Sequence, residues 1–297
     1  MVRALALATS LALTQVSGRG ALAQTPIRLL DQVVLEVTGV EDSAQYLVYR
    51  YRVLNSASSR SGVAGINLDL SAPRGTGVTI LPSTGPYMDG AAMGVGPVTD
   101  HVPVGIIEPD GWKAALMRNA ILNWYPFEGY VTENGTAAPF SKDSAPPGGS
   151  KEGFGLRSPF LAAIRRFSAE PTLASCCSRP TAGSPEGEYP PPGAFRVRGF
   201  TVAPTVPPQD MGLRLVQADL QQTCGPLRWI ADGAVCSSLR SNLARAIASQ
   251  QGDRSAAVSS LRTFLSELEG NHGAGKPVTD NAYWLLKVNV EYLLKQM

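Results

Sequence analysis

The chain contains two histidines, His101 and His272, so a histidine general base has only two possible positions. His101 follows Asp100 directly, and a hydrolase could use this pair as base and orienting carboxylate. The Gly-x-Ser-x-Gly pattern of a hydrolase nucleophile is absent. His272 lies in a Gly-rich stretch, where a solvated surface histidine is the ordinary interpretation. The sequence therefore predicts no catalytic residue, and it keeps a secreted hydrolase with His101 in its site as the alternative.

Acidic residues offer a second route to hydrolysis, because a glycosidase needs only two carboxylates that flank the scissile bond. Loop-like sequence rich in Gly and Pro carries six candidates, namely Asp89, Asp100, Glu108, Asp110, Glu128 and Glu133. Spacing alone selects no pair among these acids. The glycines from Gly90 to Gly96 precede no expected helix and end at Pro97, which argues against a phosphate cradle. No cofactor is expected.

The four cysteines are an even number, which favours disulfides in an exported chain; they are Cys176, Cys177, Cys224 and Cys236. Adjacent cysteines bond each other only with severe strain. Either Cys224 therefore bonds Cys236, or each of them bonds one of Cys176 and Cys177. A zinc site would call for short Cys-x-x-Cys knuckles, which are absent, so no metal is expected.

A cluster of aromatic residues is the best candidate for ligand binding, and its members are Trp112, Trp124, Tyr125 and Tyr130. Exposed aromatic rings suit sugar rings, because they combine a flat apolar face with a polar tip. The competing interpretation places Trp112 and Trp124 in a hydrophobic core, where large aromatics usually lie. Trp229 is expected to fill the junction between two domains.

Residues 1–23 have the pattern of a cleaved secretory signal, with Arg3, the apolar run Ala4 to Leu13 and the small residues Ala21-Leu22-Ala23. Later apolar runs fall short of the roughly 20 residues of a membrane helix, so no span is expected after cleavage. Removal of Arg3 and Arg19 from the 26 Lys and Arg balances the 24 Asp and Glu, which argues against a nucleic-acid partner. We expect an exported product, periplasmic or extracellular.

The stretch from Gln45 to Asn55 alternates strictly and places Leu47, Tyr49, Tyr51 and Val53 on one face. This is the period of a half-buried strand, which needs partner strands and an opposing layer. Leu29 to Gly39 is expected to pair with it as a hairpin across a turn that starts at Val40. Further β-structure is expected in three places: a strand from Val63 to Leu70, a hairpin from Trp112 to Phe127, and a last strand from Ala194 to Val202.

Three short motifs resemble those of bacterial immunoglobulin-like β-sandwiches. They are the Tyr-x-Tyr-x-Val-x-Asn pattern from Tyr49 to Asn55, the Gly111-Trp112 pair, and a Pro-Gly turn with an alternating strand in Ala145 to Ser158. The resemblance covers at most Leu29 to about Pro204. It implies an antiparallel β-sandwich, and it implies no particular activity.

Beyond Ser237, apolar residues recur at helical spacing and mark three helices, with Asp253 and Thr279 at expected N-caps. The run from Asn242 through Gly252-Asp253 and Gly275-Lys276-Pro277-Val278-Thr279 to Leu285-Leu286 resembles the FIMAH-type three-helix module. Such modules occur at the ends of exported bacterial proteins. The resemblance implies an accessory bundle, and it supplies no catalytic residue.

The predicted protein is mainly β plus α and has four parts: a signal peptide (1–23), an immunoglobulin-like β-sandwich (24–203), a linker and cysteine-stapled junction (204–236), and a three-helix bundle (237–297). Its expected function is non-catalytic binding, adhesion or a structural role at the bacterial envelope or exterior. A polysaccharide or an envelope protein is the expected partner. The ligand and the oligomeric state stay open.

Overall fold

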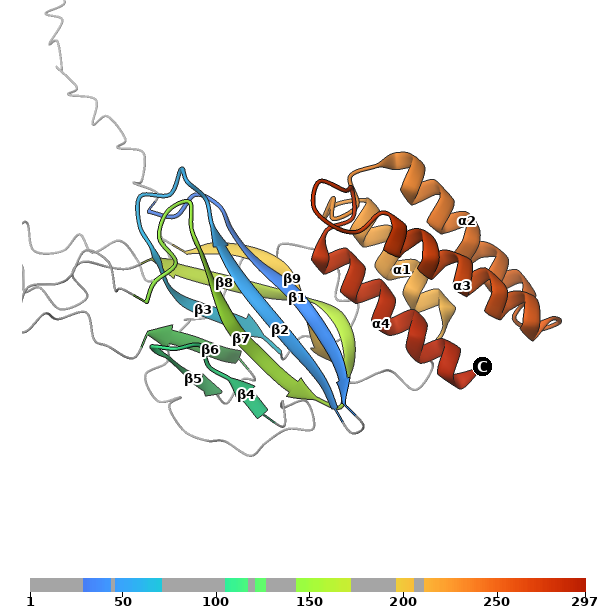
Figure 1. The fold of residues 1–297 in the computed structure, drawn as a ribbon, viewed down its shortest axis with the longest axis horizontal. Helices are drawn as coiled ribbons and strands as arrows, with labels where there is room; N and C mark the ends of the chain where they lie inside the picture. Colours follow the sequence, from blue (N-terminus) through green and yellow to red (C-terminus); the bar gives the residue numbers. More distant parts are fainter. Residues whose placement is uncertain are drawn as a thin grey trace, which may run out of the picture.

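The computed structural model describes residues 29–43, 46–70, 105–116, 121–126, 143–171, 196–205 and 211–297. Several predicted features lie outside these residues: the signal peptide, His101, Tyr130, Cys176, Cys177, Asp89, Asp100, Glu128 and Glu133. The described chain forms two antiparallel sheets, which we call the β-region, and then four helices, which we call the helical region. Figure 1 shows the helices beside the edge of the β-region that carries β1 and β9.

The first sheet has the strand order β1-β2-β7-β4. Its strands are β1 (Val33–Ser43), β2 (Tyr46–Asn55), β7 (Ser150–Ser158) and β4 (Gly105–Ile107). The predicted hairpin of β1 and β2 is confirmed, but β1 continues to Ser43 where the sequence indicated a turn from Val40. Val40 is buried, so the strand gains apolar contacts by including this residue.

The second sheet has the strand order β5-β6-β3-β8-β9. Its strands are β5 (Trp112–Leu116), β6 (Ile121–Pro126), β3 (Val63–Asp69), β8 (Leu161–Pro171) and β9 (Val197–Thr205). The predicted hairpin in the Trp-rich stretch is confirmed, because Trp112 of β5 pairs with Pro126 of β6. The strands β4 and β5 follow each other in sequence but belong to different sheets, so the short turn between them crosses from one sheet to the other.

Aromatic side chains from both sheets meet in the core between them. Trp124 is 0% exposed, and its ring lies 6.0 Å from that of Tyr51 and 5.6 Å from that of Phe154. Trp112 packs edge to face on Phe154 at 5.0 Å, and the indole N–H groups of Trp112 and Trp124 donate to the main-chain oxygens of Asp143 and Ile107. The proposal that these two tryptophans bind a ligand is corrected here, because large apolar rings gain most by leaving water and these two fill the core.

The helical region contains α1 (Leu213–Cys224), α2 (Gly233–Ser249), α3 (Arg254–Gly270) and α4 (Asp280–Gln296). The predicted N-caps are confirmed, since Asp253 accepts from the N–H of Ala256 and Thr279 accepts from the N–H of Ala282. The helix α1 was not predicted, and it occupies part of the segment interpreted as a linker. No helix in the described parts of the chain is both long and apolar enough to cross a membrane.

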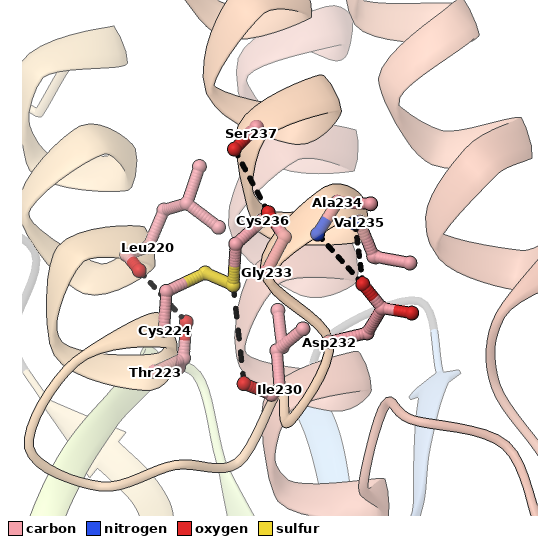
Figure 2. Close-up of a disulfide and its surroundings, with 10 residues drawn as sticks. All are labelled: Leu220, Thr223, Cys224, Ile230, Asp232, Gly233, Ala234, Val235, Cys236 and Ser237. Atoms are coloured by element: carbon pink, nitrogen blue, oxygen red, sulfur yellow. Dashed lines mark hydrogen bonds between the residues drawn. A yellow bond between two sulfur atoms is a disulfide. The ribbon is translucent and has the colours of Figure 1, made fainter.

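A disulfide joins Cys224, at the end of α1, to Cys236, in the first turn of α2. Figure 2 shows this bond beside the N-cap of α2, where the Asp232 carboxylate accepts from the N–H groups of Ala234 and Val235. Of the two pairings that the sequence left open, the bond between Cys224 and Cys236 is therefore the one formed. It ties the unpredicted helix to the three predicted ones.

Helix α4 joins the helical region to the β-region through two buried asparagines. Asn281 accepts from the main-chain N–H of Val37 at 2.9 Å and donates to the carbonyl of Leu35 at 3.2 Å. Asn289 donates to the carbonyl of Ala162 at 3.1 Å. Because β1 is an edge strand, the Asn281 amide takes the place of a neighbouring strand and covers an edge that would otherwise attract other chains.

Apolar residues fill the space around these asparagines. Leu285 and Val288 of α4 belong to the core of the β-region. Trp229, which the sequence placed between two domains, packs against the cores of both regions, as do Trp284 and Tyr292. The two regions therefore share a continuous apolar boundary that contains directed hydrogen bonds.

Replacing Asn281 with alanine should lower the free energy of unfolding by about 2 kcal/mol, because it leaves two buried main-chain groups of β1 without partners. Urea denaturation would measure the loss, and hydrogen exchange of the Val37 amide would localise it. The Asn271→Ala variant is the control, since the Asn271 side chain donates to the carbonyl of Glu267 inside the helical region and not to a strand. Unchanged exchange at Val37 in Asn281→Ala would contradict this role.

Candidate functional site

An open depression lies at the turn between β4 and β5, where the chain crosses from one sheet to the other. Its lining residues are Glu108, Pro109, Asp110, Lys151, Glu152 and Gly153. Two glycines shape the backbone here. Gly111 has φ +77°, and a Cβ at this position would lie 2.3 Å from the Asp143 carboxyl carbon. Gly153, with φ +96°, is the extra residue of a β-bulge that opposes Tyr51 and Arg52.

The charged groups of the depression are largely held by neighbours. Glu108 accepts from the main-chain N–H of Ala114 at 2.8 Å and lies 3.4 Å from the ammonium of Lys113. Lys151 donates to the carbonyl of Asp110 at 3.0 Å and lies 3.8 Å from the Asp143 carboxylate. These contacts stabilise the turn. The sequence nominated Glu108 and Asp110 among six acids, and the structure brings these two to one depression.

Tyr125 is the strand partner of Lys113, whose ammonium pairs with Glu108 of the depression. The register of β5 and β6 places Tyr125 directly opposite Lys113, and both side chains point away from the core that Trp124 fills. Tyr125 is 38% exposed, which is more than any other large hydrophobic side chain among the described residues. We call Tyr125, Lys113, Glu108 and the other depression residues the Tyr125 surface. It presents an aromatic ring beside carboxylate and ammonium groups.

His272 does not stand free in solvent as the sequence suggested. Its Nε2 lies 2.5 Å from the Asp280 carboxylate, and its ring stacks on that of Tyr283 at 3.8 Å between centroids. The other carboxylate oxygen of Asp280 lies 4.0 Å from the Arg52 guanidinium of β2. His272 thus belongs to a network of polar contacts between the helical region and the first sheet, because Asp280 contacts both His272 and Arg52.

Lys287 extends this network along α4. Burial by itself would lower the pKa of Lys287, but hydrogen bonds to Glu269 and Tyr283 and the charge of Glu291 outweigh it and raise that pKa above the usual lysine value. The ammonium of Lys287 lies 2.6 Å from Glu269 and 5.4 Å from the centre of the Tyr283 ring. These contacts position α3 against α4. Among the described residues, the ring contacts of His272 are with Asp280 and Tyr283, and neither arrangement pairs His272 with a serine or cysteine nucleophile.

The structure also shows a row of polar side chains that sequence reasoning missed. Asn123 of β6 donates to Asn67 of β3 at 2.6 Å, and Asn67 donates to Glu170 of β8 at 3.0 Å. These residues lie on the outer face of the second sheet, on the same side as Tyr125. Each stands at a polar position of an alternating strand. The sequence signal was present, but it did not say which strands are neighbours.

Two further findings concern the site. In the described ranges no three His, Cys, Asp or Glu side chains gather closely enough to hold a metal ion. Comparison of the chain with models of protein families, with curated proteins and with solved structures gave no match. The interpretation of the Tyr125 surface therefore rests on its own geometry.

Proposed function

We propose that this protein is an exported binding protein and that its Tyr125 surface contacts a polysaccharide of the bacterial envelope or exterior. In this proposal residues 1–23 are a cleaved signal, the β-region is an immunoglobulin-like sandwich, and α2 to α4 are a FIMAH-type accessory bundle. The single observation that supports binding is the exposed ring of Tyr125 beside Lys113 and Glu108. A flat ring with a polar tip stacks on a sugar, and neighbouring charged groups bond its hydroxyls.

The attachment of the helical region supports a binding role. Asn281 and Asn289 hold α4 against the edge of the β-region, away from the depression that Glu108 lines. The helices therefore do not cover the strands β4, β5 and β6, which lie on the side of the β-region away from the helices in Figure 1. A binding face on the side away from the helices suits attachment to a surface.

Retention on insoluble polysaccharides and isolated cell envelope tests this function. The oxidised protein that begins at Gln24 should be retained on at least one matrix, and Tyr125→Ala should weaken binding about tenfold, which corresponds to about 1.4 kcal/mol. The control is Tyr46→Ala, which removes a tyrosine at the start of β2, far along this strand from Arg52 and Glu152. Equal binding by Tyr125→Ala and the wild type would place the contact elsewhere.

A secreted hydrolase is the second candidate, and it is favoured by the presence of Glu108 and Asp110 in one depression. The same matrices distinguish it from a binding protein. Release of soluble sugar fragments by the wild type, and its loss in Asp110→Asn, would replace the binding function with hydrolysis. Retention without release supports the binding protein.

A further inference from the structure

The strand β5 lies at an edge of the second sheet among the described strands. In an antiparallel ladder, every second residue of an edge strand points its N–H and C=O groups away from the neighbouring strand. In β5 these residues include Trp112, which stands opposite Pro126, and Ala114, because their N–H groups bond atoms outside β6. Main-chain groups that are left unpaired on such an edge attract strands of other chains.

The connection between β4 and β5 folds back over this edge. The Pro109 carbonyl accepts from the N–H of Trp112 at 3.0 Å, and the Glu108 carboxylate accepts from the N–H of Ala114 at 2.8 Å. The other oxygen of Glu108 lies 3.4 Å from the Lys113 ammonium, which helps to hold the carboxylate in place. Glu108 therefore occupies the position that a carbonyl of a neighbouring strand would take.

The edge of β1 is covered in a similar way, but it is covered more deeply. There the Asn281 side chain bonds the N–H of Val37 and the carbonyl of Leu35, and Asn281 is buried beneath α4. The Glu108 side chain is 34% exposed, so solvent and other chains can reach it. A single substitution at Glu108 would therefore open the bond to Ala114 without removing any element of the fold.

The outer edge of β5 is suited to pairing with a second copy of itself. A two-fold axis at Ala114 would set this residue opposite Ala114 of the second copy, and the two would exchange both main-chain hydrogen bonds. In the same register Lys113 stands opposite Ala115 of the second copy, so like charges do not face each other directly. The Glu108 carboxylate lies on the donor that this pairing needs.

We propose that Glu108 guards the edge of β5 and prevents this strand from pairing with β5 of a second copy of the chain. This inference concerns self-association and does not depend on the proposed polysaccharide binding. Loss of the carboxylate frees the N–H of Ala114, and an antiparallel dimer forms through the two edges.

Sedimentation velocity of the oxidised protein that begins at Gln24 tests this proposal. Glu108→Ala should form dimers at a protein concentration about tenfold lower than the wild type requires, because its Ala114 N–H is open to a second copy. Glu108→Gln keeps a side-chain oxygen that can accept from this N–H, so it should sediment like the wild type. Glu152→Ala is the matched control, since it removes a carboxylate from the same depression whose ion-pair partner is Arg52 of β2.

A second substitution traces the dimer to β5. Proline at position 114 lacks the outward N–H, and an edge strand tolerates proline where this group faces away from the sheet. The Glu108→Ala/Ala114→Pro variant should therefore return to wild-type sedimentation. Hydrogen exchange of the wild type needs no variant: its Ala114 amide should exchange at least about tenfold more slowly than in an unfolded chain, because Glu108 holds it.

Dimers of Glu108→Ala that Ala114→Pro abolishes would support the guard. A folded Glu108→Ala variant that associates no more than the wild type would overturn it. Equal association of Glu108→Gln or Glu152→Ala would also overturn it, because the cause would then be lost charge. Dimers that persist with Ala114→Pro would exclude β5 as the pairing edge. Thermal unfolding verifies that each variant is folded, and if one is not, an unprotected Ala114 amide in the wild type overturns the proposal and a protected one supports it.

Discussion

Trp124→Ala should destabilise the protein by about 3–5 kcal/mol, the usual cost of removing a large aromatic side chain from a core. The variant loses ring contacts with Tyr51 and Phe154 from the opposite sheet. It also leaves the carbonyl of Ile107 without its indole donor. Because Trp124 is fully buried, any loss of ligand binding in this variant would report unfolding and not a missing contact. Guanidinium denaturation followed by tryptophan fluorescence would measure the change.

The neighbouring residue supplies the matched control. Tyr125 points to the opposite side of the same strand and is exposed, so Tyr125→Ala should change stability by about 0.5 kcal/mol or less. The two substitutions thus separate stability from binding at adjacent positions. A stability of Trp124→Ala equal to that of Tyr125→Ala would mean that the two sheets do not pack through this ring.

Removal of the disulfide should lower the free energy of unfolding by about 3 kcal/mol. The bond between Cys224 and Cys236 closes a short loop, with a sequence separation of 12, and restricts the unfolded chain by about this amount. The Cys224→Ser/Cys236→Ser variant tests the bond by thermal and urea unfolding. We expect the end of α1 to lose hydrogen-exchange protection before α4 does, because the bond anchors this helix directly.

Reduction of the wild type is a less direct test, because the chain also contains Cys176 and Cys177. The Cys176→Ser/Cys177→Ser variant is therefore the control, and it should keep the stabilisation supplied by the bond between Cys224 and Cys236. A Cys224→Ser/Cys236→Ser variant as stable as the wild type would show that the bond contributes nothing measurable.

The local patterns of the chain determined which residues face the core within each element. Strict alternation around Tyr49 and Tyr51 placed both side chains on the same face of β2, and this face lies in the core. Asp253 and Thr279 marked two helix starts, because a cap depends only on groups three residues away. These features follow from backbone geometry over a few residues, so one stretch of sequence contains them completely.

The tertiary structure decided which elements are neighbours. Helix α1 has Leu213, Val216 and Leu220 at helical spacing, but the repeated prolines just before it indicated a linker, and only packing against the other helices reveals the helix. Asn67 contacts Asn123 and Glu170, which lie 56 and 103 residues away in sequence.

The candidate site depends on the same long-range choices. Tyr125 and Trp124 are adjacent aromatic residues, and the sequence nominated both for ligand binding. The position of the opposing sheet buries Trp124 and leaves Tyr125 exposed. Asn281 covers the edge of β1 from 244 residues away. Strand order and helix docking depend on the free energy of burying surfaces that are distant in the chain, and periodicity within one segment carries no record of its partner.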